Sequence, residues 1–355
     1  MSSFKKALKT TLLFILILTL LSTSIMALYA ESENDYFQNT TERDELAGTI
    51  DYMVIGASHA LRGLKCDVLD EKLGVNSYNL SMPSMSMMGR YMRLKDELER
   101  NPVKQVVIEV SYDTIRRSRA KEAGTGSLYL IANNHGIKDR LRYLKTLPID
   151  RYPDAYFYFI NNGIDCIKKI AAGQFHMTNH YVTVYKGYAA YETPCEDVSH
   201  VNIAKITNKK HPSETENAEN IEYLNKMVSL CRERGIEPVL VCVPMSNTAV
   251  RRYANLDYFR EWYENYAAEN GLKFYDFNLL KSRNEFLSDV DCFRDEEHMG
   301  VTGAHAFTTY FADFMLKEEA GEDQTDLFYA SYKQYKTILK KHYLGNGYGK
   351  GTNKK

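Results

Sequence analysis

Short apolar runs alternate with amphipathic segments through most of the chain, and this alternation predicts its fold. The apolar runs are bounded by turn-forming or charged residues, which is typical of strands buried on both faces of a sheet. We expect strands at residues 51–55, 75–80, 105–110, 238–243 and 273–275. Between them, apolar side chains recur at helical spacing over residues 88–100, 217–234 and 256–270. Strands that alternate with helices in this way predict an α/β fold, a doubly wound parallel sheet with helices on both faces.

An uncharged stretch rich in leucine and isoleucine occupies residues 10–30. About 20 apolar residues suffice for a helix to cross a bilayer. Basic residues precede this stretch and acidic residues follow it: Lys5, Lys6 and Lys9 on one side, Glu31, Glu33 and Asp35 on the other. This order of charges places the N-terminus in the cytoplasm and the rest of the chain outside. We therefore predict a single-pass anchor in the cell membrane with an extracellular body.

A cleaved signal peptide is the alternative interpretation of the same segment. Cleavage would follow Ala27 or Ala30, but Ile25 and Leu28 lie two positions earlier, where a small residue is preferred. These bulky residues favour a retained anchor, which a polar, acidic linker at residues 31–47 would join to the body.

Residues 114–216 interrupt the alternation of strands and helices and are rich in tyrosine, asparagine, histidine and arginine. Loops at the carboxyl ends of parallel strands surround the ligand crevice, so an insertion after the third strand should lie beside or above any site. We divide the chain into an anchor at 1–30, a linker at 31–47, an α/β domain at 48–320 that contains the insertion, and a basic C-terminal helix and tail at 321–355.

The composition argues against several classes of function. The formal net charge is -1, and no basic stretch of the central chain is interleaved with stacking aromatic residues, so we expect no nucleic-acid partner. The six cysteines lack metal-ligand spacing, and we expect at most one disulfide, between Cys166 and Cys195. His176 and His180 have a helical metal-ligand spacing, but no third ligand lies in that stretch. We therefore expect no metal and no cofactor.

Ser58 directly follows the first expected strand, in the sequence Gly-Ala-Ser-His at residues 56–59. A serine at this place lies at the carboxyl edge of the sheet, where the N-terminal amides of a following helix can stabilise an oxyanion. An ordinary strand-to-helix turn, with Ser58 as the helix N-cap, explains the same pattern.

Asp295 and His298 precede the last amphipathic segment of the α/β domain. A tight turn would let the carboxylate hold one imidazole nitrogen while the other faces a nucleophile. An acidic turn with a solvated histidine is the alternative for these two residues alone. The order of all three residues, with Ser58 after the first strand and the other two before the last helix, favours a catalytic triad.

With these residues in this order, the chain resembles the SGNH/GDSL hydrolase superfamily. It is especially similar to the membrane-anchored branch that includes the D-alanyl transfer protein of teichoic acid synthesis and companions of membrane-bound O-acyltransferases. The resemblance rests on GASH at 56–59, YNL at 78–80, VIEV at 107–110 and DEEHMGVTG at 295–303. It implies Ser58 as the nucleophile, His298 as the general base and Asp295 as the acid that orients the imidazole.

The resemblance also implies an oxyanion hole that this chain matches only in part. The family uses the amide of the nucleophile, a glycine amide after the second strand and an asparagine side chain after the third. Here Ser81 replaces the glycine, and no asparagine directly follows the third strand. Losing one donor typically costs about 2.7–4 kcal/mol of transition-state stabilisation, so turnover should be slow unless another group compensates. The candidate oxyanion or substrate-binding groups are Ser81, Asn79 and His59.

Two functions of different class are consistent with these residues. The first is an extracytoplasmic, serine-dependent O-acyl transferase or esterase that acts on cell-surface polysaccharide through an acyl-serine intermediate. Its expected partners are the membrane, the polysaccharide or another acylated substrate, and a membrane-bound O-acyltransferase. The second is a non-catalytic accessory that keeps the fold in order to bind a glycan or such an acyltransferase.

Overall fold

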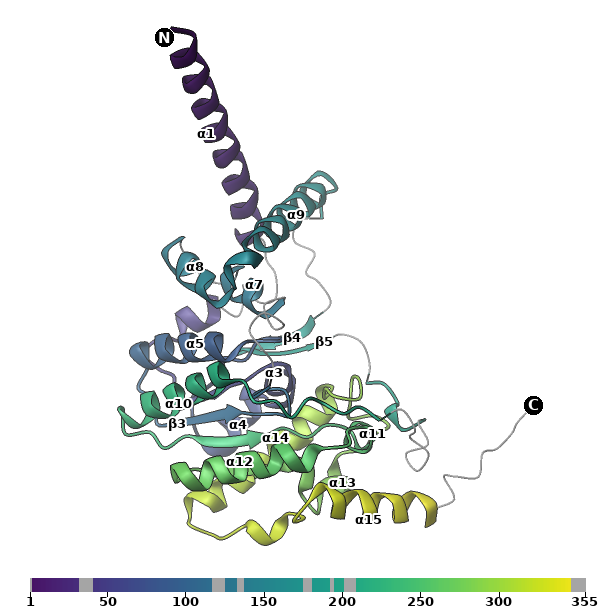
Figure 1. Ribbon diagram of the computed structural model, residues 1–355. Coiled ribbons are helices and arrows are strands. Elements are labelled where there is room, and N and C mark those ends of the chain that lie inside the picture. Colours follow the sequence, from purple (N-terminus) through teal and green to yellow (C-terminus); the bar gives the residue numbers. More distant parts are fainter. Residues whose placement is uncertain are drawn as a thin grey trace, which may run out of the picture.

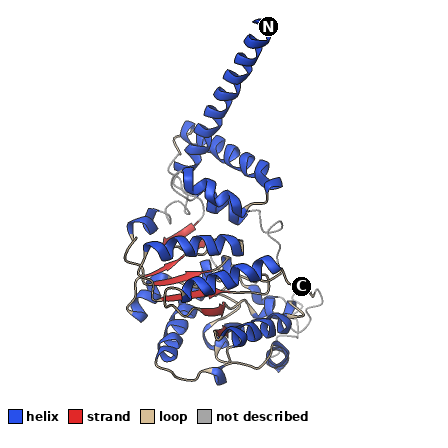
Figure 2. Cartoon of the chain, turned by 60° about the vertical axis from the view of Figure 1, so that its left-hand side comes forward, coloured by secondary structure: helices blue, strands red, loops and turns tan. Residues whose placement is uncertain are grey.

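The computed structural model describes residues 2–31, 41–116, 125–132, 137–174, 181–191, 195–200 and 209–345. Five parallel strands form its central sheet in the order β2-β1-β3-β6-β7 (Figures 1 and 2). Their bounds are β1 Tyr52–Ile55, β2 Ser77–Asn79, β3 Gln105–Glu109, β6 Val239–Cys242 and β7 Lys273–Asp276. Each strand lies within two residues of the apolar run that predicted it. The prediction of a doubly wound parallel sheet is confirmed.

Helices cover both faces of this sheet, and each face has its own apolar core. The first face is covered by α5 (Met87–Arg100), α10 (Ala218–Arg232) and α12 (Leu256–Asn270). The second is covered by α3 (Ser58–Gly63), α4 (Cys66–Leu73) and α14 (Val301–Glu319). Strand β1 serves both cores, since Met53 and Ile55 point into the first while Tyr52 and Val54 point into the second. Burial on both faces is the reason that such strands are apolar throughout.

Local sequence signals explain where these helices begin and end. The Ser86 hydroxyl caps α5 by accepting a hydrogen bond from the Gly89 amide at 3.2 Å. The Asn217 side chain caps α10 in the same way, accepting from the Glu219 amide at 3.0 Å. Gly271 ends α12 with a φ of +61°, in the left-handed conformation that glycine adopts without strain.

The described parts of the insertion fall into two groups. The first contains α7 (Thr125–Ala132), α8 (Ile137–Tyr143) and α9 (Tyr152–Ala171), which lie together at the lower end of α1 (Figure 1). The second contains the antiparallel hairpin of β4 (Tyr181–Tyr185) and β5 (Tyr188–Tyr191). His176 and His180 lie outside the described residues.

The hairpin and the segment at residues 195–200 lie beside the carboxyl edge of the sheet. At the end of β2, the Asn79 amide donates a hydrogen bond to the Lys186 carbonyl in the hairpin turn at 2.8 Å. Farther along, the Glu196 amide donates to the Phe293 carbonyl at 2.8 Å, close to the turn that holds Asp295 and His298. This part of the insertion is therefore where we expected it, next to the predicted site.

Helix α1 (Ser2–Glu31) contains a 22-residue segment, Phe4–Ile25, that is long and apolar enough to cross a membrane. A signal sequence near an N-terminus would meet the same criteria. Near the end of this segment, α1 packs on α9, where Ile25 lies against Gly163. There the hydroxyls of Ser22 and Tyr156 share a hydrogen bond of 2.8 Å.

Helix α15 (Tyr332–Gly345) packs on the α/β domain. Its Tyr335 hydroxyl donates to the Asn247 side chain at 2.6 Å, and its Tyr332 hydroxyl donates to the Asp276 carboxylate at 2.7 Å. The described chain also contains a short helix at residues 41–45, the helices α11 (Asn247–Arg252) and α13 (Arg283–Phe286), and the 3₁₀ turns η1 (Leu144–Thr146), η2 (Ile149–Arg151), η3 (Val198–His200), η5 (Phe277–Leu279) and η6 (Thr325–Leu327).

All six cysteines are described, and all six are free thiols. The disulfide suggested between Cys166 and Cys195 is therefore not formed. The two residues belong to different groups of the insertion, since Cys166 is buried on α9 and Cys195 lies beside the loop at Gly300.

Candidate active site

Ser58 is the first residue of α3, directly after a sharp turn that leaves β1. The turn needs a glycine at position 56, because a Cβ there would lie 2.6 Å from the Cβ of Glu109 and 2.8 Å from that of Ala60. Backbone amides in the first turn of a helix lack an intrahelical acceptor, so the Ser58 N–H lies where it can donate to a ligand. The turn thus presents both the hydroxyl and the amide of Ser58 at the carboxyl edge of the sheet.

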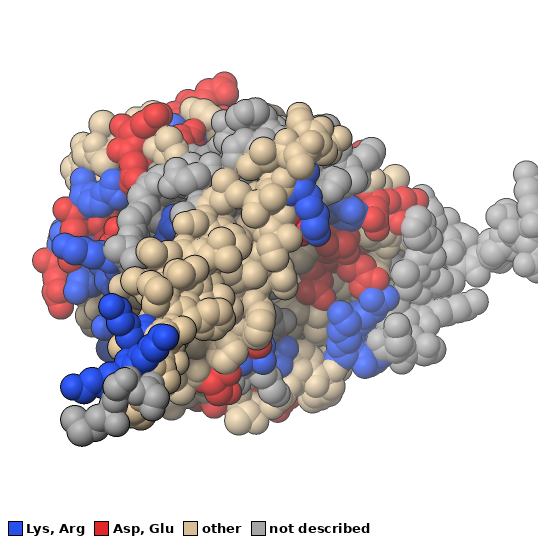
Figure 3. Space-filling model, turned by 90° about the horizontal axis from the view of Figure 1, so that it is seen from above, with Lys and Arg blue, Asp and Glu red and all other residues tan. Residues whose placement is uncertain are grey.

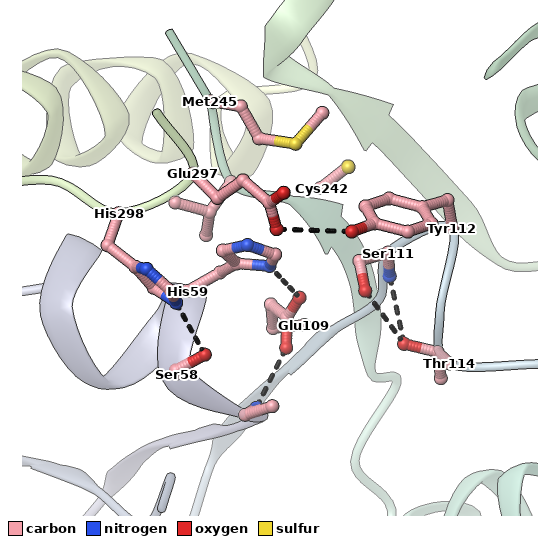
Figure 4. A network of polar contacts seen from close by, with 12 residues as sticks. Ser58, His59, Glu109, Ser111, Tyr112, Thr114, Cys242, Met245, Glu297 and His298 are labelled. Carbon is pink, nitrogen blue, oxygen red and sulfur yellow. Dashed lines mark hydrogen bonds and ion pairs between the residues drawn. The ribbon is translucent and has the colours of Figure 1, made fainter. Parts of the chain in front are cut away.

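His298 links Ser58 to Asp295 by hydrogen bonds. Its Nε2 lies 2.8 Å from the Ser58 Oγ (Figure 4), and its Nδ1 lies 2.9 Å from both carboxylate oxygens of Asp295. These are the contacts that a nucleophile, a general base and an orienting acid make in a serine hydrolase. The structure therefore brings together the three residues predicted for the triad.

A tight turn explains why Asp295 and His298 meet. One oxygen of the Asp295 carboxylate accepts hydrogen bonds from the backbone amides of Glu297 and His298, each at 2.9 Å. The turn is closed by the Arg294 amide, which donates to the His298 carbonyl at 2.8 Å. The spacing of three residues thus brings the carboxylate to the imidazole through contacts within one short turn.

The electrostatics of the triad suit a neutral base beside a charged acid. Burial raises the pKa of the Asp295 carboxyl, but the His298 side chain and the two amides outweigh it and lower that pKa to about 2. Burial lowers the pKa of His298, and the positive charge of His59 lowers it further, against the opposite effect of Asp295. His298 is therefore unprotonated at neutral pH and able to accept the Ser58 proton.

Glu109 supports the nucleophile turn from below. This last residue of β3 is fully buried, and its carboxylate accepts a hydrogen bond from the Ala57 amide at 2.9 Å, next to Ser58 (Figure 4). Its charge is balanced by Arg90 at 3.6 Å and by His59 at 3.7 Å. Burial raises the pKa of Glu109, but His59, Arg90 and the Ala57 amide outweigh it and lower that pKa. The carboxylate is thus charged and holds the turn in place.

His59 lies between Glu109 and the triad. Its ring centroid is 5.2 Å from that of His298 (Figure 4). Burial lowers its pKa, but the carboxylate of Glu109 outweighs burial and raises the pKa above the usual value for histidine. Its Nε2 is buried and has no hydrogen-bond partner within the described parts of the chain. The two histidines therefore differ: His298 is held neutral, and His59 is favoured in its charged form.

The oxyanion donors predicted after the second strand are used by the fold itself. The Ser81 amide donates to the Asn79 side-chain oxygen at 3.0 Å. The Asn79 side-chain nitrogen donates to the carbonyls of Ala60 at 2.8 Å and Leu64 at 3.0 Å, which ties β2 to α3. The Ser81 hydroxyl, in contrast, is buried at the same edge with no hydrogen-bond partner in the described structure. After β2, the Ser81 hydroxyl is therefore a side-chain donor that makes no hydrogen bond in the described structure, whereas the Asn79 side chain is engaged.

A second polar group borders the site and was not recognised in the sequence. The Glu297 carboxylate accepts from the Tyr112 hydroxyl at 3.1 Å (Figure 4), from the Tyr253 hydroxyl at 2.5 Å and from Lys210 at 3.0 Å. Burial raises the pKa of Glu297, and Tyr253, His59 and Lys210 together lower it below the usual value. In the sequence, only the position of Glu297 next to His298 indicated that it borders the site. This signal is weak, because acidic residues next to a histidine are common.

The pH dependence of activity tests these electrostatics. Because the reaction needs neutral His298, kcat/KM should fall in acid with a midpoint below the ordinary histidine pKa of about 6.5. Burial and the His59 charge both disfavour protonated His298, so replacing His59 with glutamine should move this midpoint to higher pH. The measurement is kcat/KM for a small ester against pH in the wild type and in His59→Gln. A midpoint that is unchanged, or lower, in His59→Gln would contradict the electrostatic coupling.

The fold and the site together define an arrangement of the serine-hydrolase class, a Ser-His-Asp triad at the carboxyl edge of a doubly wound sheet. No protein-family model and no curated protein matches the chain. Solved structures align over most of its length. A GDSL-like lipase from Bacteroides thetaiotaomicron VPI-5482 is 12% identical, with 82% of this chain and 99% of that chain covered and a TM-score of 0.37.

Two further structures give similar results. A protein from Bacteroides fragilis NCTC 9343, provisionally named an acylhydrolase, is 10% identical, with 79% of this chain and 94% of that chain covered and a TM-score of 0.38. The acetyl xylan esterase AlAXEase is 13% identical, with 76% of this chain and 99% of that chain covered and a TM-score of 0.23. Similarity of this degree does not establish a shared function. The catalytic assignment rests on the geometry of Ser58, His298 and Asp295.

Proposed function

We propose that this protein is a membrane-anchored, extracytoplasmic acyl esterase or O-acyl transferase that acts on cell-surface polysaccharide through an acyl-serine intermediate. The observation that carries the proposal is the continuous hydrogen-bonded chain from the Ser58 hydroxyl through His298 to Asp295. The resemblance to the SGNH/GDSL superfamily adds the acyl substrate class. The chemistry needs no metal and no cofactor, because the nucleophile, base and acid are all side chains of the chain itself.

In the first half-reaction the Ser58 Oγ attacks the acyl carbonyl carbon while its proton passes to the Nε2 of His298. The oxyanion forms beside the Ser58 amide, and we assign its further stabilisation to the positive charge of His59, whose ring lies 5.2 Å from that of His298. The tetrahedral adduct then collapses. The bond to the leaving oxygen breaks, that oxygen takes the proton from His298, and an acyl-serine remains.

In the second half-reaction a hydroxyl attacks the acyl-serine carbonyl and gives its proton to His298. Collapse of the second adduct breaks the bond to the Ser58 Oγ, which recovers its proton. Water as the acceptor makes the protein an esterase, and a sugar hydroxyl makes it a transferase. The charged Asp295 stabilises the imidazolium that forms in both halves.

The anchored location rests on the charge order around Phe4–Ile25 and on the way α1 packs. Basic residues precede this span and acidic residues follow it, which favours export of everything after it. The end of the span contacts α9, so this end of α1 is packed on the body. A tethered site meets substrates near the membrane, where an integral membrane acyltransferase could supply the acyl group at high effective concentration.

The second candidate function is a non-catalytic accessory that binds a glycan or a membrane acyltransferase. One observation favours it: the Ser81 amide and the Asn79 side chain, the predicted oxyanion donors, are both engaged within the protein. The intact Ser58-His298-Asp295 contacts oppose it, because a binding protein does not need a nucleophile aligned with a base.

A fluorophosphonate probe distinguishes the two functions. We expect the probe to label the full chain at Ser58 alone, because attack on phosphorus requires a serine activated by His298. Mass spectrometry of the labelled peptide locates the adduct, and a His298→Ala variant should lose most of the labelling. Absence of an adduct on folded wild-type protein would instead support the accessory function.

The anchor is tested by topology in intact cells. Protease added outside should degrade the body, and the chain should leave the membrane fraction only with detergent, because a spanning helix is not released by salt or alkali. Protease added to intact cells with a cytoplasmic marker protein provides the control. A soluble product that begins near Glu31 would show that the segment is a cleaved signal.

A further inference from the structure

Helix α9 has an unusual distribution of side chains for a helix on a water-exposed domain. Its 20 residues divide into three faces. One face carries Ala155 and Cys166, which are buried. A second face is exposed to solvent and apolar, with side-chain exposures of 38–60% for Tyr152, Tyr156, Phe157, Ile164, Ile167 and Ile170.

The spacing along α9 shows that the exposed apolar residues form one stripe. Tyr152, Tyr156, Ile164 and Ile167 follow one another at steps of four, eight and three residues, so they project from neighbouring positions around the helix. The charged residues occupy the other exposed side: Asp154, Asp165 and Lys168. A stripe of this width, exposed next to a polar face, is typical of helices that lie in a membrane interface.

The position of α9 relative to α1 indicates what the apolar stripe contacts. A Cβ on Gly163 would lie 2.2 Å from the carbonyl oxygen of Ile25, so the two helices cross in close contact at the last residue of the candidate span. About one turn earlier on α1, the Ser22 hydroxyl shares a hydrogen bond with the hydroxyl of Tyr156 on α9. The middle of α9 therefore lies at the depth where α1 leaves the hydrocarbon layer.

The surface around α1 agrees with this placement. Seen from above, residues other than Lys, Arg, Asp and Glu form a broad continuous area on the face from which α1 projects, and charged side chains lie mainly around its margin (Figures 1 and 3). The neighbouring η2 also exposes 80% of Ile149. Lys168 and Lys169, in the last turn of α9, can reach lipid headgroups while the isoleucines contact acyl chains.

We propose that the exposed stripe of α9 docks into the outer surface of the same bilayer that α1 crosses, so that the body is held to the membrane by two elements rather than by one flexible tether. The proposal rests on retention of α1 as the anchor. Helices of this kind bury their apolar face about 5–10 Å into the boundary between headgroups and acyl chains. Two fixed elements define the orientation of the domain, which a single tether would leave free.

Tryptophan quenching by brominated lipid tests the docking. The chain has one tryptophan, Trp262 on α12, so a Trp262→Phe background makes every new tryptophan a specific reporter. The full chain is reconstituted into bilayer nanodiscs whose lipids carry bromine on the acyl chains. Three variants are compared: Leu16→Trp inside the span, Ile167→Trp on the stripe, and Asp165→Trp on the same turn of α9 but on its polar face.

Relative to nanodiscs without bromine, Ile167→Trp should lose most of its fluorescence, while Asp165→Trp should keep most of it. Equal quenching of these two, or no quenching of Ile167→Trp, would overturn the proposal. The second result is also the one expected if an integral membrane protein, rather than lipid, covers the stripe. Leu16→Trp reports on the anchor separately: quenching there without quenching at Ile167→Trp would refute the docking and leave the anchor intact.

Discussion

Replacing either Ser58 or His298 with alanine should lower kcat/KM for ester cleavage by about 10⁴-fold or more. The Ser58 hydroxyl forms the covalent bond with the acyl group. The His298 Nε2, 2.8 Å from the Ser58 Oγ, is the base that takes its proton. Both side chains lie partly exposed at the edge of the sheet, so their removal should leave the circular-dichroism spectrum and the melting temperature nearly unchanged. Initial rates with a small ester, measured on the detergent-purified full chain, provide the comparison.

Matched controls separate catalysis from general damage. His305→Ala removes an exposed histidine on α14, and Ser213→Ala removes an exposed loop serine. Both should keep full activity. Retained activity in Ser58→Ala would refute the nucleophile assignment. In cells, Ser58→Ala should change the content of ester-linked acyl groups on surface polysaccharide: a decrease indicates a transferase, and an increase indicates an esterase.

Replacing Glu109 with alanine should lower the free energy of unfolding by about 3–5 kcal/mol, the range measured when one partner of a buried ion pair is removed. The substitution leaves Arg90 buried without the carboxylate that balances it, and it takes the acceptor away from the Ala57 amide. Activity should fall as well, since the turn that presents Ser58 loses its support. Urea unfolding of the full chain in detergent, followed by Trp262 fluorescence, measures the loss.

Two variants sharpen this test. Glu109→Gln keeps an oxygen that can accept from Ala57, so it should restore part of the activity lost in Glu109→Ala. Glu99→Ala removes an exposed glutamate on α5 and should change the free energy of unfolding by about 0.5 kcal/mol or less. An effect of Glu109→Ala no larger than that of Glu99→Ala would show that the buried carboxylate does not hold the turn.

The site separates two histidines that are adjacent in space but opposite in role. His298 is held neutral by burial and can accept a proton, whereas His59 is favoured as a cation by Glu109. A positive charge at 5.2 Å from the base ring keeps that base from being protonated before substrate arrives. The same charge could stabilise the oxyanion, which would compensate for the donors that Asn79 and Ser81 use within the fold.

The sequence by itself was sufficient wherever the controlling interactions are local. Buried strands are rich in apolar residues, as in β1 (YMVI) and β6 (VLVC), and apolar runs predicted all five strands within two residues. Asp295 and His298 could be paired from sequence, because residues three apart can meet in a tight turn, as the contacts of the Asp295 carboxylate with the His298 amide and ring show. Ser58 was recognised from its position after β1 together with the order of Asp295 and His298 before the last helix, since the position alone also fits an ordinary helix N-cap.

The tertiary structure decided every feature that depends on contacts between distant segments. Ser58 and His298 are 240 residues apart, and only the packing of the sheet against α14 brings their side chains to 2.8 Å. Glu109 looked like an ordinary strand end, yet the order β1-β3 places it beneath the nucleophile turn, between Arg90 and His59. Asn79 was a candidate to bind an oxyanion, but its side-chain nitrogen donates to the Ala60 carbonyl on α3. This partner could not be predicted from the sequence. The stripe on α9 likewise acquires meaning only from its contact with α1, since periodicity shows that a helix is amphipathic but not what its apolar face meets.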